Sequence, residues 1–222
     1  MRLTLALLSL LGVASADQNW EKVSDKNGII VDRRPVEGTK LKEFRGRGKI
    51  NAPFTSLLAV FSDVDKATEW MDQCKQSNLV EDHGDRQKIV YNRTKAQWPV
   101  WDRDAVLLNN LYVDEGEGRV RIEFSTVDNK MPPQKGVVRM PYLKGHWYMW
   151  PESHDKTRVE YEVHADPGGS LPAWLVNYVS RELPRKTITG LAKQVKRRSY
   201  PEMEKHIREF PEIQSLEARF AK

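Results

Sequence analysis

The sequence predicts an α+β fold in which one strongly curved antiparallel sheet is closed by a long C-terminal helix. Two strand-like segments at 28–33 and 40–50 precede residues 53–71, where apolar side chains have helical spacing. Residues 87–165 then alternate between apolar and polar side chains, as strands do. Residues 170–198 return to a helical spacing, and an amphipathic helix of this length suits the concave face of such a sheet.

The two N-terminal strands are bounded by residues that interrupt pairing. The strand at 28–33 ends before Pro35, which cannot donate to a neighbouring strand. The strand at 40–50 contains Gly46 and Gly48, which indicate a sharp bend.

Five further strands are predicted in the middle of the chain. These segments are 87–94, 104–113, 119–126, 137–150 and 158–165. In the third, Val120, Ile122 and Phe124 share one face and charged residues occupy the other. In the second, one face carries Ala105, Leu107, Asn109, Leu111 and Val113. An antiparallel sheet with one dry face and one wet face gives this pattern.

Both predicted helices carry an apolar stripe. In the first, Pro53 fits the first turn, and the stripe consists of Phe54, Leu57, Leu58, Phe61, Val64, Ala67 and Met71. In the second, Ser170 is a good N-cap, Pro172 fits the first turn, and Pro184 should kink the helix because it lacks an N–H. The second stripe consists of Leu171, Leu175, Val179, Leu183, Ile188, Leu191 and Val195.

Residues 1–16 have the pattern of a secretory signal peptide. Arg2 precedes an apolar run from Leu3 to Val13, which is too short to span a bilayer, and Ala14–Ala16 provide small residues for cleavage. We therefore expect an exported protein, either periplasmic or secreted.

The remaining chain predicts one domain at 17–199 and a polar C-terminal extension at 200–222, either a peripheral helix or a loosely held segment. Cys74 is the only cysteine, so neither an intramolecular disulfide nor a thiolate metal site can form. We expect a monomer that needs no cofactor.

The charge is mildly basic, with 36 Lys and Arg residues against 31 Asp and Glu residues and a formal net charge of +5. This permits attraction to anionic lipid without requiring it, and export argues against nucleic acid as a partner. The last predicted helix is basic enough to approach an anionic bilayer transiently. Its basic residues are Arg181, Arg185, Lys186, Lys193, Lys196, Arg197 and Arg198.

Three stretches of the sequence resemble START domains, the lipid-transfer modules of the helix-grip superfamily. They are QWPVWDRDAV (97–106), in which Arg103-Asp104 leads into a strand, MPPQKGVVR (131–139) and GGSLPAWLVN (168–177). Their order and spacing also agree, so the resemblance covers residues 20 to 198.

The resemblance implies a sheet that grips the C-terminal helix around an apolar tunnel for one sterol, phospholipid or other hydrophobic molecule. It also implies that the loop at 96–104 is a lid. Asp102, Arg103 and Asp104 would clamp this lid, because an arginine between two carboxylates at the junction of loop and strand can hold hydrogen bonds in fixed directions through its planar guanidinium. The residues expected to contact the ligand are Leu107, Asn109, Leu111, Trp98, Trp101, Leu175, Tyr178 and Val179.

Asn109 is the informative position on its strand face, where it is the only polar residue. Relatives that bind cholesterol carry a buried arginine six residues beyond the Arg of the Arg-Asp pair, which is the place of Asn109. Its acidic partner should fall near Val90, or at Tyr91 or Asn92 after a one-residue slip, and none of these is an acid. The cholesterol-type ion pair is therefore not expected. A buried Asn needs a partner, so Asn109 is either a ligand contact or a structural core residue.

Two alternatives to a carrier remain. The first is an enzyme such as a polyketide cyclase or aromatase, because the fold also supports catalysis. However, of the five histidines only His146 could point inward, and no nucleophile elbow or phosphate loop occurs. The second is an interaction module whose tunnel is filled by its own aromatic residues. A cavity on the order of several hundred Å³ would favour the carrier, which we expect to be a non-enzyme that binds lipid through apolar burial.

Overall fold

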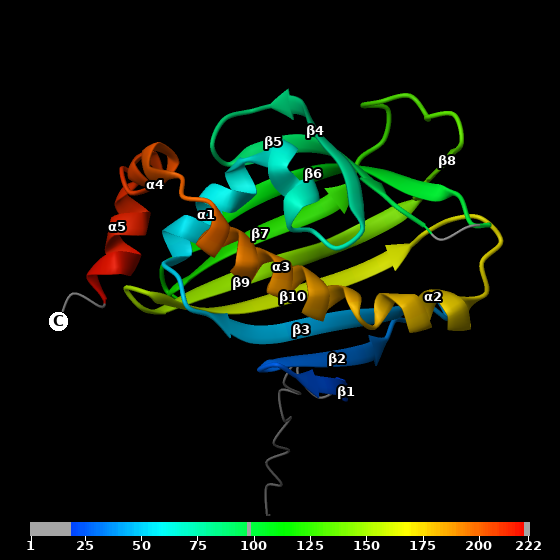
Figure 1. Cartoon of the computed structure of the whole chain (residues 1–222), viewed down its shortest axis with the longest axis horizontal. Helices are drawn as coiled ribbons and strands as arrows, with labels where there is room; N and C mark the ends of the chain where they lie inside the picture. Colours follow the sequence, from blue (N-terminus) through cyan, green and yellow to red (C-terminus); the bar gives the residue numbers. More distant parts are fainter. Residues whose placement is uncertain (1–18, 97–98, 220–222) are drawn as a thin grey trace, which may run out of the picture.

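A computed structural model describes residues 19–96 and 99–219 of the chain. It contains one ten-stranded sheet in the order β1-β2-β3-β10-β9-β7-β6-β5-β4, with β8 paired to β6 (Figure 1). All pairings are antiparallel except the parallel β6–β8 pair. The strands are β1 (Glu21–Lys26), β2 (Ile29–Pro35), β3 (Lys42–Ile50), β4 (Cys74–Asp82), β5 (Gln87–Thr94), β6 (Asp102–Asp114), β7 (Arg119–Thr126), β8 (Val137–Arg139), β9 (Tyr142–Ser153) and β10 (Lys156–Asp166).

Each of the two long helices predicted from the sequence consists of two shorter helices in the structure. The helices are α1 (Phe54–Ser62), the 3-10 helix η1 (Val64–Glu69), α2 (Ala173–Ser180), α3 (Leu183–Arg197), α4 (Pro201–Ile207) and α5 (Pro211–Ala218). The expected kink at Pro184 is a complete break, because Pro184 sits in the first turn of α3 instead of inside a helix. The C-terminal extension forms α4 and α5, which lie beside α1 (Figure 1). The predicted α+β class, a large antiparallel sheet with C-terminal helices, is confirmed.

Helix α3 lies against the inner face of the sheet and approaches β3 closely. Ile188 and Leu191 of α3 are almost completely buried. A Cβ atom at Gly46 would lie 2.7 Å from the Cβ of Pro184, which is closer than two carbon atoms can approach. Gly46 is therefore required for the contact between β3 and α3.

The inner face of the sheet is the one that alternation predicts. Val120 and Val159 are fully buried on this face, and Phe124 and Val163 are also buried. Aromatic side chains fill its centre: the rings of Trp147 and Tyr161 stack at 4.4 Å, and Phe61 and Trp70 pack edge to face against Trp147. The space between α3 and the sheet is thus largely occupied by the protein's own side chains.

Candidate functional site

A cavity of about 140 Å³ lies beside this aromatic cluster. Its walls come from α1 and η1, from strands β4 to β7, and from α4 and α5. Most of the lining is apolar, including Phe61, Trp70, Leu111, Ile122, Ile207 and Phe210. Among the described residues, none of α2 or α3 lines this cavity, so the C-terminal extension provides the helical wall that we expected from the long helix.

Six neutral polar side chains also line the cavity: Ser62, Ser77, Gln87, Asn92, Asn109 and Asn110. Ser77 is 4% exposed, and its Oγ has no hydrogen-bond partner within the described part of the chain. The Oδ1 of Asn92 is also buried and also has no hydrogen-bond partner within the described part of the chain. The Nδ2 of Asn109 donates to the Leu107 carbonyl oxygen at 3.2 Å, so the amide group of Asn109 is partly satisfied by its own strand.

The predicted ligand contacts separate into two groups. Asn109 and Leu111 line the cavity, and Leu107 is buried in the core on the same strand. Trp98 lies outside the described residues. Trp101, Leu175, Tyr178 and Val179 do not line this cavity, and Trp101 is 63% exposed, Tyr178 73% and Val179 66%.

The orientation of α2 explains why its predicted residues face solvent. The Asn177 side chain accepts a hydrogen bond from the Lys42 N–H at 2.8 Å and donates one to the Lys40 carbonyl oxygen at 3.0 Å. With Asn177 and the buried Val176 turned toward the protein, Tyr178 points away from it, because successive residues of a helix differ by about 100°. Val179 is also exposed. The assignment of these two residues to the cavity is wrong.

The residues of the proposed clamp do not pair with one another. The Arg103 guanidinium donates to the carbonyl oxygens of Trp101, Pro167 and Gly168, and so joins β6 to the segment between β10 and α2. Successive side chains of a strand point to opposite faces, so Arg103 cannot sit between its two neighbours. The three residues therefore hold this region through other partners and not through one another.

Asp102 and Asp104 each bind a different basic residue. Asp104 is almost completely buried and accepts two hydrogen bonds from Arg139, the shorter at 2.8 Å. Asp102 accepts hydrogen bonds from the Ala96 N–H at 3.1 Å and from Arg93 at 2.8 Å. The Ala96 N–H is the largest cause of the low pKa of Asp102, which is about 2, although burial acts in the opposite direction. These contacts hold both ends of the loop at 96–102.

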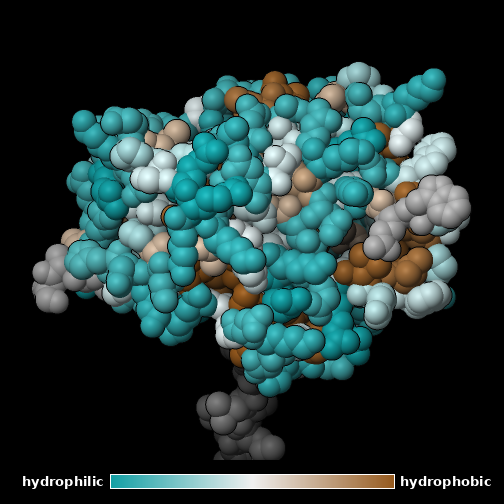
Figure 2. All heavy atoms as spheres, in the orientation of Figure 1, coloured by the Kyte–Doolittle hydropathy of each residue, from teal (hydrophilic) through white to brown (hydrophobic). Residues whose placement is uncertain are grey.

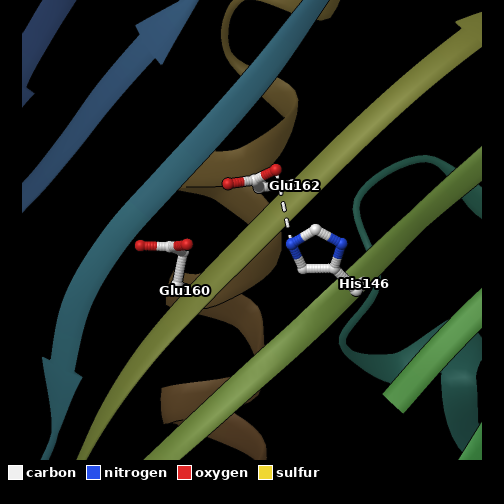
Figure 3. Close-up of side chains that lie close together, drawn as sticks. All are labelled: His146, Glu160 and Glu162. Carbon is white, nitrogen blue, oxygen red and sulfur yellow. Dashed lines mark ion pairs between the residues drawn. The ribbon is translucent and has the colours of Figure 1, made fainter. Parts of the chain in front are cut away.

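His146 does not point into the cavity, as the sequence suggested it could. It lies opposite Glu162 in the β9–β10 pairing, on the outer face of the sheet, and its Nε2 is 3.3 Å from a Glu162 oxygen (Figure 3). Glu160 lies next to this pair, and in the described part of the chain these are the three side chains that could meet at a metal ion. Arg34 and Arg45 already face Glu162 at 3.8 and 4.0 Å, so the cluster is a network of ion pairs into which a cation would bring repulsion.

Two residues in the cavity wall are not recognised as functional candidates from the sequence. Ser77 lies on β4, where two irregularities in the pairing with β5 obscure the alternation of side chains. His206, assigned only to a polar tail, lines the cavity, and its Nε2 pairs with Asp85 at 3.0 Å. This hydrogen bond raises the pKa of His206.

A large antiparallel sheet that holds a C-terminal helix against its inner face defines the helix-grip fold class (Figure 1). The model of the START domain family matches residues 1–198. The chain therefore belongs to the START domain family.

Individual relatives agree with this assignment. An uncharacterized protein from Pseudomonas aeruginosa is 30% identical over 200 residues, covering 89% of this chain and 98% of the relative. The phosphatidylcholine transfer protein of Rattus norvegicus is 27% identical over 167 residues, covering 73% of this chain and 77% of the relative. The crystal structure of a STAR-related lipid transfer protein fragment from Xanthomonas axonopodis has a TM-score of 0.74 at 34% identity, covering 80% of this chain and 99% of that one.

Proposed function

We propose that this protein binds one hydrophobic molecule, a lipid, beside the inner face of its sheet and carries it through an aqueous compartment. Lipid binding is the general property of the family to which the chain belongs, and its named relatives are lipid transfer proteins. The observation that carries the proposal is the cavity, which combines mostly apolar walls with a few neutral polar groups. Apolar burial provides affinity, and the polar groups provide selection.

The cavity must enlarge to receive a lipid. Its volume of about 140 Å³ is below the roughly 300–1,000 Å³ of typical ligand sites. A wall must therefore move, and α4–α5 is the wall that lies beyond the family match. The segment at 198–200 links it to α3, and its polar contacts with the cavity rim include those of His206 with Asp85 and of Arg86 with Glu212. In this proposal, displacement of α4–α5 admits the ligand.

Contact with a membrane is assigned to α2. Hydrophobic residues gather around α2 at the surface (Figure 2), and Trp174 and Tyr178 are strongly exposed there, near the exposed Val179. Tryptophan and tyrosine favour the interface between lipid and water. The predicted basic stripe contributes less than expected, because Arg185, Lys186, Arg197 and Arg198 already face carboxylates.

Export is proposed from residues 1–16 alone, with a periplasmic or secreted protein as the result. Among the described residues, no helix is both long and apolar enough to cross a membrane. We also propose that the protein acts as a monomer and is not an enzyme. Mass spectrometry of the mature protein from its own host tests the proposed export. We expect an N-terminus near Asp17, and an intact Met1 would contradict export by cleavage.

Transfer between vesicles tests the carrier function. Donor vesicles with a fluorescent lipid and a quencher are mixed with acceptor vesicles and catalytic amounts of protein. We expect the transfer rate to rise in proportion to protein concentration. A rate equal to that of spontaneous exchange, with several classes of lipid, would contradict carriage.

A further inference from the structure

Three cavity-lining side chains, those of Trp70, Ser77 and Asn92, carry a buried polar atom without a partner in the described part of the chain. Two of these residues lie opposite each other on neighbouring strands. Ser77 of β4 and Asn92 of β5 are direct partners in the antiparallel pairing. Residues opposite each other in such a pair project to the same face of the sheet, and both line the cavity. The hydroxyl and the carboxamide thus form one small polar patch in a mostly apolar wall.

Their burial points to a ligand. In the described part of the chain, neither Ser77 Oγ nor Asn92 Oδ1 has a hydrogen-bond partner, and Ser77 as a whole is 96% buried. Buried polar atoms are nearly always hydrogen-bonded. A serine hydroxyl can donate and accept, and a carboxamide can present its oxygen or its nitrogen, so the pair complements a group that both donates and accepts.

The charges around the cavity favour a neutral group. The cationic side chains of Arg86 and Lys88 line the rim, but Arg86 pairs with Glu212 and Lys88 Nζ lies 2.9 Å from an Asp82 oxygen. His206, which also lines the cavity, pairs with Asp85. A phosphate buried next to Ser77 and Asn92 would meet no free cation among the described lining residues, although such anions need charge-assisted hydrogen bonds. A hydroxyl or an amide needs none.

Asn109 does not belong to this patch. Asn92 pairs with Ala105 of β6, whereas Asn109 pairs with Lys88, four residues further along both strands. At about 3.4 Å per residue, the two amides are separated by more than 10 Å along the sheet. The polar group singled out in the sequence and the one with unpaired atoms are therefore distinct.

We propose that Ser77 and Asn92 form a subsite for the neutral head of a lipid, a hydroxyl or an amide, while its hydrocarbon part lies against Phe61, Leu111 and Ile122. This inference rests on the proposed function and narrows it to a class of ligand. It separates this protein from a carrier of phosphocholine lipids, although one of its relatives is a phosphatidylcholine transfer protein.

The test compares two lipids that differ only in the head: a diacylglycerol and a phosphatidylcholine with identical acyl chains. The full-length mature protein is incubated with vesicles of each, and bound lipid is counted by native mass spectrometry. We expect the diacylglycerol to be preferred by about ten-fold or more. Ser77→Ala and Asn92→Leu should each reduce its binding by about ten-fold, the scale of a lost hydrogen bond.

Asn78→Leu is the matched control, because Asn78 is exposed on the same strand and its Oδ1 accepts a hydrogen bond from Gln76. It should bind diacylglycerol like the original protein. Folding is checked by the melting temperature of the ligand-free variants. Ser77→Ala and Asn92→Leu should melt at or above the original temperature, because each removes a buried polar atom that lacks a protein partner.

The remaining outcomes of the binding and melting experiments would overturn either the subsite or the proposed function. Equal or tighter binding of phosphatidylcholine, unaffected by Ser77→Ala and Asn92→Leu, would overturn the subsite and leave the carrier function intact. A marked fall in melting temperature for both variants would also overturn it, because the atoms would then be satisfied within the fold. If neither lipid binds and no other lipid does, the proposed function fails and the subsite with it.

Discussion

The two ends of the inner face are packed in different ways. Under α3, the contact at Gly46 leaves no room for a Cβ atom, and Ile188 and Leu191 are almost completely buried. Under α4–α5, two short helices cover a cavity that contains buried polar atoms without protein partners. The gripping helix and the cavity are therefore separate: α3 packs tightly at one end, and in our proposal the other end opens to admit the ligand.

The largest expected effect comes from filling the contact at Gly46. In Gly46→Val, the new side chain would collide with Pro184 and Ile188, so α3 cannot seat on β3. We expect a loss of about 3 kcal/mol in the free energy of unfolding, measured by urea denaturation. Gly116→Val is the control, because a Cβ at Gly116 meets no atom within 4 Å. Similar losses in both variants would show that the packing at Gly46 is not special.

The same substitution at the two ends tests whether they unfold separately. Ile188 of α3 and Ile213 of α5 are both almost completely buried, and truncation to Ala removes about 3 kcal/mol of packing at either site. We expect Ile188→Ala to lower the global unfolding midpoint. Ile213→Ala should instead speed amide hydrogen exchange within residues 201–218 and accelerate lipid transfer between vesicles.

A different result for Ile188→Ala and Ile213→Ala would contradict separate unfolding of the two ends. If Ile213→Ala lowers the global midpoint as much as Ile188→Ala and leaves lipid transfer unchanged, then α4–α5 is part of the rigid fold. The proposal that displacement of α4–α5 admits the ligand would then be wrong.

A buried carboxylate on the outer face of the sheet should make the stability of the protein depend on pH. Burial and the neighbouring Glu162 charge raise the pKa of Glu160 from 4.5 to about 7. Because the pKa is higher in the folded state than in the unfolded state, the contribution of Glu160 to stability is fully present below about pH 4.5 and is lost as pH rises through about 7. Glu160→Gln should therefore make stability less sensitive to pH in this window.

Melting temperatures between pH 4 and pH 8 test this prediction. The exposed Glu202 provides the control variant Glu202→Gln, which should follow the original curve. An unchanged slope in Glu160→Gln would mean that Glu160 titrates as an ordinary surface carboxylate.

The smallest effect on stability, but a clear effect on membrane contact, is expected on α2. Trp174→Ala and Tyr178→Ala remove exposed rings, so unfolding free energy should change by no more than about 0.5 kcal/mol. Affinity for vesicles, measured by co-sedimentation, should fall by about ten-fold in the double variant because the inserted apolar area is lost. Tyr112→Ala, which removes another exposed ring, should bind like the original protein. An equal affinity in all variants would exclude α2 as the contact.

The fold could be predicted where local patterns suffice. Alternation identified the inner face around Val120 and Val159, because the period of side chains in a strand is a local property. Strand β4 was missed because its pairing shifts between Cys74 and Gln76 and again between Leu79 and Glu81. Helices α4 and α5 were hidden by a polar composition that leaves only a few buried residues, such as Ile213 and Leu216.

The site could be predicted only in part. Asn109 was found because it interrupts an apolar strand face, and it does line the cavity. Tyr178 and Val179 were misplaced because tertiary hydrogen bonds of Asn177 set the rotation of α2. Ser77 could not be recognised because its burial depends on strands and helices distant in the sequence.

Native mass spectrometry of the protein purified from its own host tests the central claim most directly. The account predicts one lipid per chain, with a hydroxyl or amide head, released when the protein is denatured. Protein that remains empty in repeated preparations, and that takes up no lipid from vesicles of any composition, would contradict a ligand space beneath α4–α5.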